Sequence, residues 1–383
     1  MEKRDKRIAH ARVLVTDASY DHFEPVMPKI VEALGLDAWY RGLSGKIVFI
    51  KPNMIGLFPP DRHATTHPLV VGAIAKFFRE AGARVIVGDN CGVGGYGLNQ
   101  KVAQVTGIID AVHDAYKNIA MNTCLVSLGS KFMDSIAVSR DILEADVLIN
   151  LPKMKTHSLT LVTGAVKNMF GIVAGAGKSR CHRLAPGARD FSELLADIYS
   201  IRPPDLTIMD GIVSMEGNGP TSGTPKQVGK ILASTNAVAL DAVMCRIMGL
   251  PPEEVHHIRH ASQGGLGPID TDSIEIAGEK PEELPFKLPM TVKRFDFLGR
   301  LINRGFFGTI SRSKLVLDKK LCKKCKICVE GCPTKAMQMD EFPGINEDNC
   351  IRCLCCQELC PESAWKSGGL MGRFQGRRIL SSE

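Results

Sequence analysis

Residues 322–333 read CKKCKICVEGCP, and residues 350–361 read CIRCLCCQELCP. Both segments space their cysteines as C-x2-C-x2-C-x3-C and place a proline after the last one. This spacing is typical of bacterial sequences that hold two [4Fe–4S] clusters, in which three close cysteines bind one cluster and the fourth binds the other. The repeat therefore predicts a small fold built around two iron–sulfur clusters.

The cysteines of the repeat are the expected cluster ligands. Disulfides would suit a secreted scaffold, and structural zinc takes four ligands with wider spacing between cysteine pairs, so we set both aside. Cys355 breaks the pattern, and we interpret it as a spare thiol packed against a cluster, with a swapped ligand as the alternative. Residues 313–367 resemble bacterial-type ferredoxins. The expected ligands are Cys322, Cys325, Cys328 and Cys360 for the first cluster, and Cys350, Cys353, Cys356 and Cys332 for the second.

The overall composition is that of an ordinary soluble protein. Hydrophobic residues make up 44% and charged residues 23% of the 383 residues, which excludes a wholly disordered chain. No uncharged apolar run approaches the about 20 residues that a transmembrane helix needs. Residues 1–10, MEKRDKRIAH, lack the apolar core of a secretion signal. Together with the free thiols, these features lead us to expect a cytoplasmic protein.

The net charge of +7 is unevenly placed, because residues 287–330 hold 12 Lys or Arg and three Asp or Glu. Few aromatic residues lie between these charges and no nucleic-acid motif accompanies them, so we expect no nucleic-acid partner. We interpret the segment as a basic stretch that balances the negative clusters or docks an acidic partner. The expected organisation is an α/β domain at 1–285, a basic linker at 286–312, the two-cluster domain at 313–367 and a basic tail at 368–383.

Upstream of the repeat, short β-rich apolar runs alternate with helical stretches. This alternation predicts an α/β fold with a mostly parallel sheet and helices on both faces. The predicted strands lie at 13–15, 46–50, 84–87, 123–128, 146–151, 206–209, 230–234 and 274–277. The predicted helices lie at 25–36, 68–81, 101–116, 158–172 and 237–250.

Polar side chains follow four of the predicted strands, where ligand sites of open parallel sheets collect. A sheet edge with no binding role is the alternative, because loops are polar in any case. The excess of lysine over acid favours an anionic small molecule. The candidate side chains at these strand ends are Lys51, Asn53, Asp89, Lys153, Lys155, His157, Asp210 and Glu216.

The segment at 153–172, KMKTHSLTLVTGAVKNMFGI, is the most informative of these. Its lysines and histidine precede a helix predicted to begin near Ser158, and the free N–H groups of a helix N-terminus bind phosphate or carboxylate. Lys167 and Asn168 follow further along the same predicted helix. A charged loop before an ordinary amphipathic helix is the alternative.

The tentative catalytic residues are His157, Lys153 and Asp210. A histidine can act as an acid or a base near neutral pH, although a single histidine is often only a hydrogen-bonded structural group.

Six separated blocks, in this order, resemble the domain-of-unknown-function family 362 over residues 10–280. The blocks are KPNMIG, ATTHPLVVGAI, EAGARVIVGDN, LINLPKMKTHSLTLVTGAVKNMFGIV, TIMDGIVSMEGNGPTSGTP and NAVALDAVMCRIMGL. The resemblance implies an iron–sulfur protein with an α/β domain, and leaves the reaction open. Cys91 stands where a small or polar residue is expected, which leaves open a reactive thiol. The matching family positions are Lys51, Asn53, Asp89, Lys153, Lys155, His157, Lys167, Asn168, Asp210, Glu216, Asn218 and Asp241.

Three functions remain as hypotheses. The first is a ferredoxin-linked oxidoreductase that passes single electrons between the clusters and an anionic small molecule. The second is an electron carrier in which the α/β domain is a docking platform and the basic stretch binds an acidic partner protein, which would donate or accept electrons. The third is a maturation protein that delivers a metal or cofactor, with Cys91, Cys181 and His182 as its best ligands.

Overall fold

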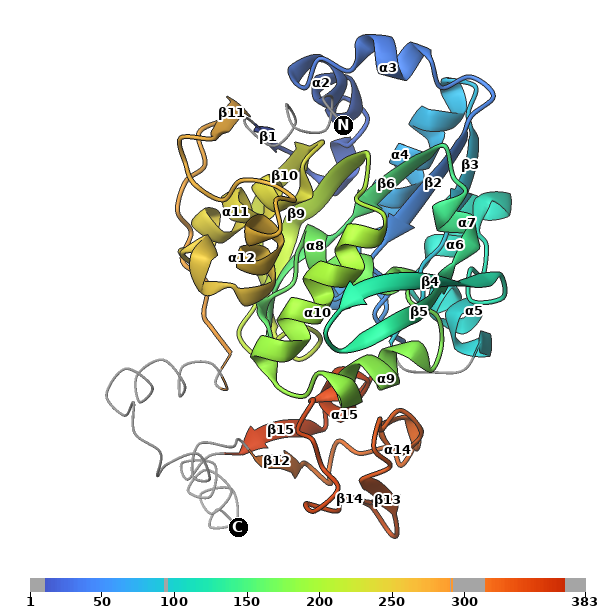
Figure 1. The fold of residues 1–383 in the computed structure, drawn as a ribbon, viewed down its shortest axis with the longest axis vertical. Coiled ribbons are helices and arrows are strands. Elements are labelled where there is room, and N and C mark those ends of the chain that lie inside the picture. Colours follow the sequence, from blue (N-terminus) through green and yellow to red (C-terminus); the bar gives the residue numbers. More distant parts are fainter. Residues whose placement is uncertain (1–10, 93–95, 290, 292–313, 369–383) are drawn as a thin grey trace.

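The computed structural model describes residues 11–92, 96–289, 291 and 314–368, and its centre is a nine-stranded sheet (Figure 1). The strands of the main path follow the order β11-β1-β10-β9-β6-β2-β3. All neighbours on this path are parallel except the two pairs that include β10, which confirms the predicted mostly parallel sheet. The strands are β1 (Ala11–Asp17), β2 (Ile47–Pro52), β3 (Arg84–Val87), β6 (Val147–Leu151), β9 (Leu206–Glu216), β10 (Thr224–Ser234) and β11 (Ile274–Gly278).

Each face of the sheet carries its own hydrophobic core, because successive strand residues point to opposite faces. In β2, Phe49 belongs to one core, whereas Val48 and Ile50 belong to the other. Helices cover both faces, as the sequence predicts (Figure 1). The first core includes α8 (Ala165–Asn168), α10 (Ala188–Ile201), α11 (Ala237–Ile247) and α12 (His256–Gln263), and the second includes α2 (Val26–Ala33), α4 (Pro68–Glu80) and α6 (Ile108–Val112).

Two expected elements differ from the prediction. Residues 123–128 do not join the central sheet, because β4 (Thr123–Ser130) pairs with β5 (Met133–Ser139) as a separate hairpin. The helix expected at 101–116 is divided between α5 (Tyr96–Val105) and α6, because Gly107 adopts a φ of 72° at the junction.

The helix predicted at 158–172 is wrong in its first half. Residues 153–157 form β7 (Lys153–His157), which pairs in parallel with β9 and antiparallel with β8 (Leu161–Val162). Threonine side chains compete with helix formation here: Thr163 donates to the carbonyl of Lys153 at 3.0 Å. The helix begins only at Ala165.

The N-terminus of α8 is already occupied by a carboxylate of the protein itself. Asp241 in α11 accepts hydrogen bonds from the backbone N–H groups of Ala165 at 2.6 Å and Val166 at 2.9 Å. A Cβ on Gly164 would lie 2.4 Å from this carboxylate, so the close approach requires glycine. The prediction of an anion site at a helix N-terminus near Ser158 is therefore wrong, because the helix begins at Ala165 and its first N–H groups are bound to Asp241.

The cysteine repeat folds into a small α+β unit below the sheet domain (Figure 1). Its two halves have matching backbones: φ is 55° at Lys324 and at Arg352, and 64° at Lys326 and at Leu354. Most of the expected linker at 286–312, and the expected tail except Gly368, lie outside the described residues. The elements are β12 (Lys314–Leu317), α14 (Ile327–Glu330), β13 (Met337–Met339), β14 (Pro343–Ile345), α15 (Cys355–Glu358) and β15 (Trp365–Gly368).

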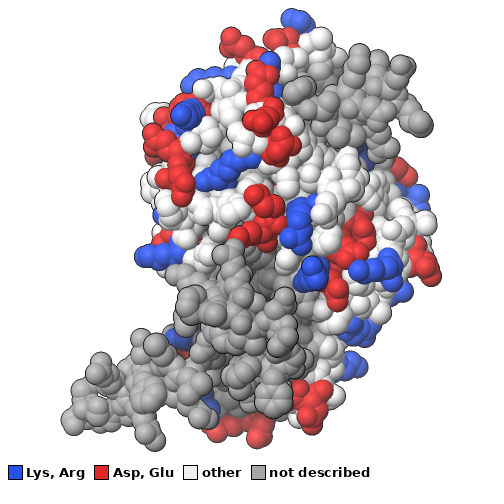
Figure 2. Space-filling model, turned by 60° about the vertical axis from the view of Figure 1, so that its left-hand side comes forward, with Lys and Arg blue, Asp and Glu red and all other residues white. Residues whose placement is uncertain are grey.

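The surface charges of the sheet domain are mixed. Figure 2 shows acidic and basic side chains interspersed over the visible face. In the described part of the chain, no helix has the length and apolar character to cross a membrane.

Candidate site between the sheet and the cysteine repeat

The structure gathers the cysteines of the repeat around two cavities. One cavity is lined by Cys322, Cys325, Cys328 and Cys360, and the other by Cys332, Cys350, Cys353 and Cys356. In each set three cysteines come from one half of the repeat and the fourth from the other half. These groupings match the two ligand sets expected from the spacing.

The donor set suits an iron–sulfur cluster better than a single metal ion. A mononuclear zinc site would draw its sulfurs to about 2.3 Å from one point. Among the described residues, no three His, Cys, Asp or Glu side chains are grouped closely enough to hold one metal ion. Four thiolates around a cavity, with Ala364 N–H donating to Cys360 Sγ at 3.3 Å, fit a larger group whose sulfurs accept hydrogen bonds.

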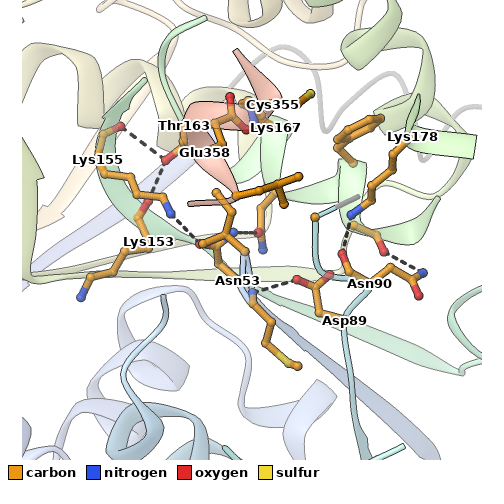
Figure 3. A pocket seen from close by; sticks show the side chains of 18 of the residues that line it. Asn53, Asp89, Asn90, Lys153, Lys155, Thr163, Lys167, Lys178, Cys355 and Glu358 are labelled. Atoms are coloured by element: carbon orange, nitrogen blue, oxygen red, sulfur yellow. Dashed lines mark hydrogen bonds between the residues drawn. The ribbon is translucent and has the colours of Figure 1, made fainter. Parts of the chain in front are cut away.

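A third cavity, of about 80 Å³, lies at the carboxyl edge of the sheet and is closed on one side by α15 (Figure 3). Six of the predicted residues line it: Asn53, Asp89, Lys153, Lys155, Lys167 and Asn168. Lining residues that the sequence analysis did not select for this site include Asn90, Phe170, Lys178, Phe191, Cys355, Glu358 and Leu359, together with His182, which it had considered only as a metal ligand.

Two of the predicted lysines are neutralised by buried carboxylates. Lys51 Nζ lies 2.8 Å from Asp89 Oδ1, and Lys153 Nζ lies 2.7 Å from Asp210 Oδ2. Lys51 and Asp210 do not line the cavity, and Lys153 turns its ammonium away from the group around Asn53 (Figure 3). Asp210 lies inside β9 rather than after it, because this strand continues to Glu216.

Three other lysines of the cavity have no such counter-ion. Lys155 donates to Asn53 Oδ1 at 2.8 Å and to the carbonyl of Ala64, and Lys178 donates to the carbonyls of Asn90 and Cys91. Lys167 makes no hydrogen bond or ion pair with a described residue. Burial lowers the pKa of all three amines, which is the effect expected when ammonium groups are removed from water.

Glu358 is the carboxylate that faces these three lysines. It comes from α15, and its Oε1 lies 3.1 Å from His157 Nε2. Burial alone would raise the pKa of Glu358, but the interaction with the N–H of His157 and the positive charge of Lys167 lower it to about 2. The cavity therefore holds two buried amines, of Lys155 and Lys178, and the half-buried Lys167, against one carboxylate that is not already paired with a lysine, which favours an anion.

His157 acts on Glu358 and does not reach the cavity. Its Nδ1 accepts the backbone N–H groups of Leu159 at 3.0 Å and Thr160 at 3.3 Å, which leaves the proton on Nε2. Burial lowers the pKa of His157 to about 4, so the ring is neutral at pH 7. A ring that is neutral at pH 7 does not suit the acid–base role expected there, and it contacts Glu358 instead.

Two more expected residues lie away from the cavity or are unreactive. Glu216 accepts a hydrogen bond from the backbone N–H of Lys287 at 3.1 Å and pairs with Lys226. Cys91 donates to Asn99 Oδ1 at 2.9 Å, and burial raises the pKa of its thiol to about 12. Cys91 is therefore a protonated thiol rather than a reactive thiolate. Cys181 and His182 do not join it in a metal site.

Glu358 and Lys178 are the charged lining residues that the sequence did not point to. Glu358 lies between two cysteines of the repeat, where the spacing drew attention to the cysteines alone. Lys178 follows a glycine-rich stretch far from any predicted strand end. Neither position carries a local signal for the cavity.

A family model described as a domain of unknown function (DUF362) matches residues 48–246, which is just over half of the 383 residues. The chain belongs to the DUF362 family. A second model, described as a 4Fe-4S dicluster domain, matches residues 314–361 of this DUF362 protein. The chain is thus an iron–sulfur protein of the electron-transfer type.

The DUF362 protein is similar to one curated relative and two solved structures. It is 33% identical over 274 residues to a thylakoid-associated protein from Synechocystis, covering 68% of this chain and 82% of the relative. It is 15% identical to the lactate racemase apoprotein from Thermoanaerobacterium thermosaccharolyticum, with a TM-score of 0.36, covering 62% of this chain and 57% of that one. A protein from Thermotoga maritima is 13% identical, with a TM-score of 0.37 and coverages of 65% and 60%.

Proposed function

We propose that this protein is an oxidoreductase that passes single electrons between two [4Fe–4S] clusters and a small anion bound in the cavity at the sheet edge. The observation that carries the proposal is the position of α15. Cys356 in this helix lines the cavity of the second cysteine set, whereas Cys355 and Glu358 of the same turn line the lysine-rich cavity. One helical turn therefore separates the expected second cluster from the expected anion.

The cluster-bearing unit is held against the sheet domain by specific contacts around this turn. Thr221 donates to the carbonyl of Glu358 at 3.2 Å, and Arg62 donates to Ser363 Oγ at 3.1 Å. Leu359 packs so closely on Gly92 that a Cβ there would lie 2.7 Å from its Cδ2. These contacts keep the short path between the two cavities in place.

The residues of the cavity have different roles in binding. Lys155 and Lys167 supply positive charge for an anion, and Asn53 holds the ammonium of Lys155 in position. Each cluster, when bound, supplies or accepts one electron, so a pair suits a two-electron change in the bound molecule. Leu359 and Phe170 add apolar surface to the lining of the site.

The first prediction tests this function with Lys167→Ala. Cluster-loaded protein is reduced with dithionite, freed of excess reductant and mixed anaerobically with fractionated small-molecule extract. We expect one fraction to restore the oxidised cluster absorbance, and we expect the variant to respond at least about tenfold more slowly, since it loses a charge-assisted contact of about 1.5–3 kcal/mol.

The matched control is Lys76→Ala, whose side chain is 70% exposed on α4. Iron content must be equal in all three proteins. Equal reoxidation of wild type and Lys167→Ala would contradict the anion site. Reoxidation only by protein fractions would favour the electron-carrier hypothesis instead.

A further inference from the structure

The two halves of the cysteine repeat differ sharply in what lies between their cysteines. The first half places Lys323, Lys324, Lys326 and Ile327 between its first three cysteines, and the second half places Ile351, Arg352, Leu354 and Cys355 at the same positions. Because the backbone angles match at equivalent positions, the fold itself does not require the lysines. The second half serves as an internal control for the first.

The halves also differ in exposure. Residues 323–326 are all exposed, including Cys325 of the first cysteine set, whereas no residue of 351–356 is exposed. The second half instead faces the sheet domain through α15, as Figure 1 shows. One cysteine of the first set, Cys325, is therefore exposed at the surface, whereas Cys355 and Glu358 of the second half line the lysine-rich cavity.

The exposed loop combines charge with apolar surface. Residues 319–326 contain five lysines and no acidic residue, and all five lysines are exposed. Beside them, Leu321 is 38% exposed and Val316 is 56% exposed. A few apolar side chains among like charges suit a small, transient contact with a partner of opposite charge.

Balancing the charge of a cluster does not explain the lysines. The second cysteine set would hold the same cluster charge, yet its half carries only Arg352 between the cysteines, and Arg352 pairs with Glu347 at 3.1 Å. Lys319 and Lys324 lie over the ring of Phe342 at 5.0 Å and 4.2 Å, which holds them at the surface around this loop.

We propose that the loop at 319–326 is the docking surface for an acidic electron-carrier protein, which exchanges one electron at a time with the first cluster. The inference rests on the proposed function in one respect, the presence of a cluster in the first cysteine set. It adds a route: partner, first cluster, second cluster, anion.

The test uses two protein electron acceptors of opposite charge. Full-length, cluster-loaded protein is reduced and mixed by stopped flow with flavodoxin, which is acidic, or with cytochrome c, which is basic. We expect the rate constant with flavodoxin to fall as salt is raised, and the rate constant with cytochrome c to rise. The Lys320→Glu/Lys323→Glu variant should lower the rate constant with flavodoxin by at least about tenfold and should not lower the rate constant with cytochrome c.

The matched control is Lys29→Glu/Lys76→Glu, which reverses two exposed lysines on the sheet domain. Lys320→Gln/Lys323→Gln provides a second loop variant if the first loses iron. Equal flavodoxin rates in the loop and control variants would overturn the proposal. Reoxidation by the small anion should be unchanged in the loop variants, so a failure here is distinguishable from a failure of the anion site.

An anionic membrane surface is the competing partner for a lysine-rich loop. Sedimentation with phosphatidylglycerol vesicles separates the two. Vesicle binding that is lost in the loop variants while their flavodoxin rates stay at the wild-type value would overturn the proposal in favour of a membrane.

Discussion

Lysine residues dominate the cavity, but their partners decide what each one does. Lys51 and Lys153 are close to the strand ends and are neutralised by Asp89 and Asp210. Lys155 is buried and Lys167 is half-buried, and neither has a carboxylate of its own. Buried charges without partners are costly, so these two lysines mark where a ligand charge would be compensated.

The buried ring of His157 should make the unfolding free energy of the protein depend on pH. Its pKa is about 4 in the folded protein, below the ordinary value of 6.5, because burial disfavours the charged ring. Between these values the unfolded chain binds more protons, so the unfolding free energy falls as pH falls. From pH 7 to pH 5 the loss is about 2 kcal/mol for this group.

Anaerobic urea denaturation at the two pH values measures this loss. His157→Gln should reduce the pH dependence by about that amount, whereas His22→Gln, at an exposed position, should leave it unchanged. If the unfolding free energy changed with pH equally in wild type and His157→Gln, the ring would not be held neutral by burial.

Helix α15 is only four residues long, yet it connects two sites. Cys356 lines the second cysteine cavity, and Cys355 lines the lysine-rich cavity on the other side. Successive residues of a helix point in different directions, so adjacent cysteines face different cavities. This placement supports the interpretation of Cys355 as a spare thiol.

Serine substitutions at Cys355 and Cys356 should distinguish a spare thiol from a cluster ligand. Cys356→Ser should lower the iron content by about four atoms per chain, or convert the second cluster, because it removes a ligand. Cys355→Ser should keep about eight atoms per chain. Iron analysis and EPR of the reduced proteins make the comparison, and iron loss in Cys355→Ser would show that Cys355 is a ligand.

We expect the proposed anion and the proposed second cluster to influence each other through their charges. Reduction adds one negative charge beside the cavity, so an anion should bind more weakly to the reduced protein. By reciprocity, a bound anion should lower the midpoint potential of the second cluster. A tenfold difference in affinity corresponds to about 59 mV for one electron.

Dye-mediated titration with and without oxalate as the probe anion measures this shift. Lys167→Ala should abolish it, and Lys76→Ala should retain it. A potential that is unmoved by oxalate, under conditions where oxalate binding is shown by calorimetry, would contradict the linkage while leaving the anion site intact.

Features that depend on short stretches of chain follow from the order of the residues alone. The spacing of the cysteines predicts both ligand sets, and the alternation of apolar runs predicts the parallel sheet. Each of these signals is carried by residues that are close together in the chain. Asn53 and Asp89 are brought to one cavity because the parallel strands β2 and β3 end at one edge.

Long-range packing sets which charges remain without a counter-ion and which face of α15 meets the sheet. The Lys153–Asp210 pair joins residues 57 positions apart, and Glu358 reaches His157 from the other unit of the molecule. The N-terminus of α8 is taken by Asp241 of a distant helix, which the local sequence at 153–172 does not reveal. Pairing and burial between distant segments depend on packing, and no spacing along the chain encodes them.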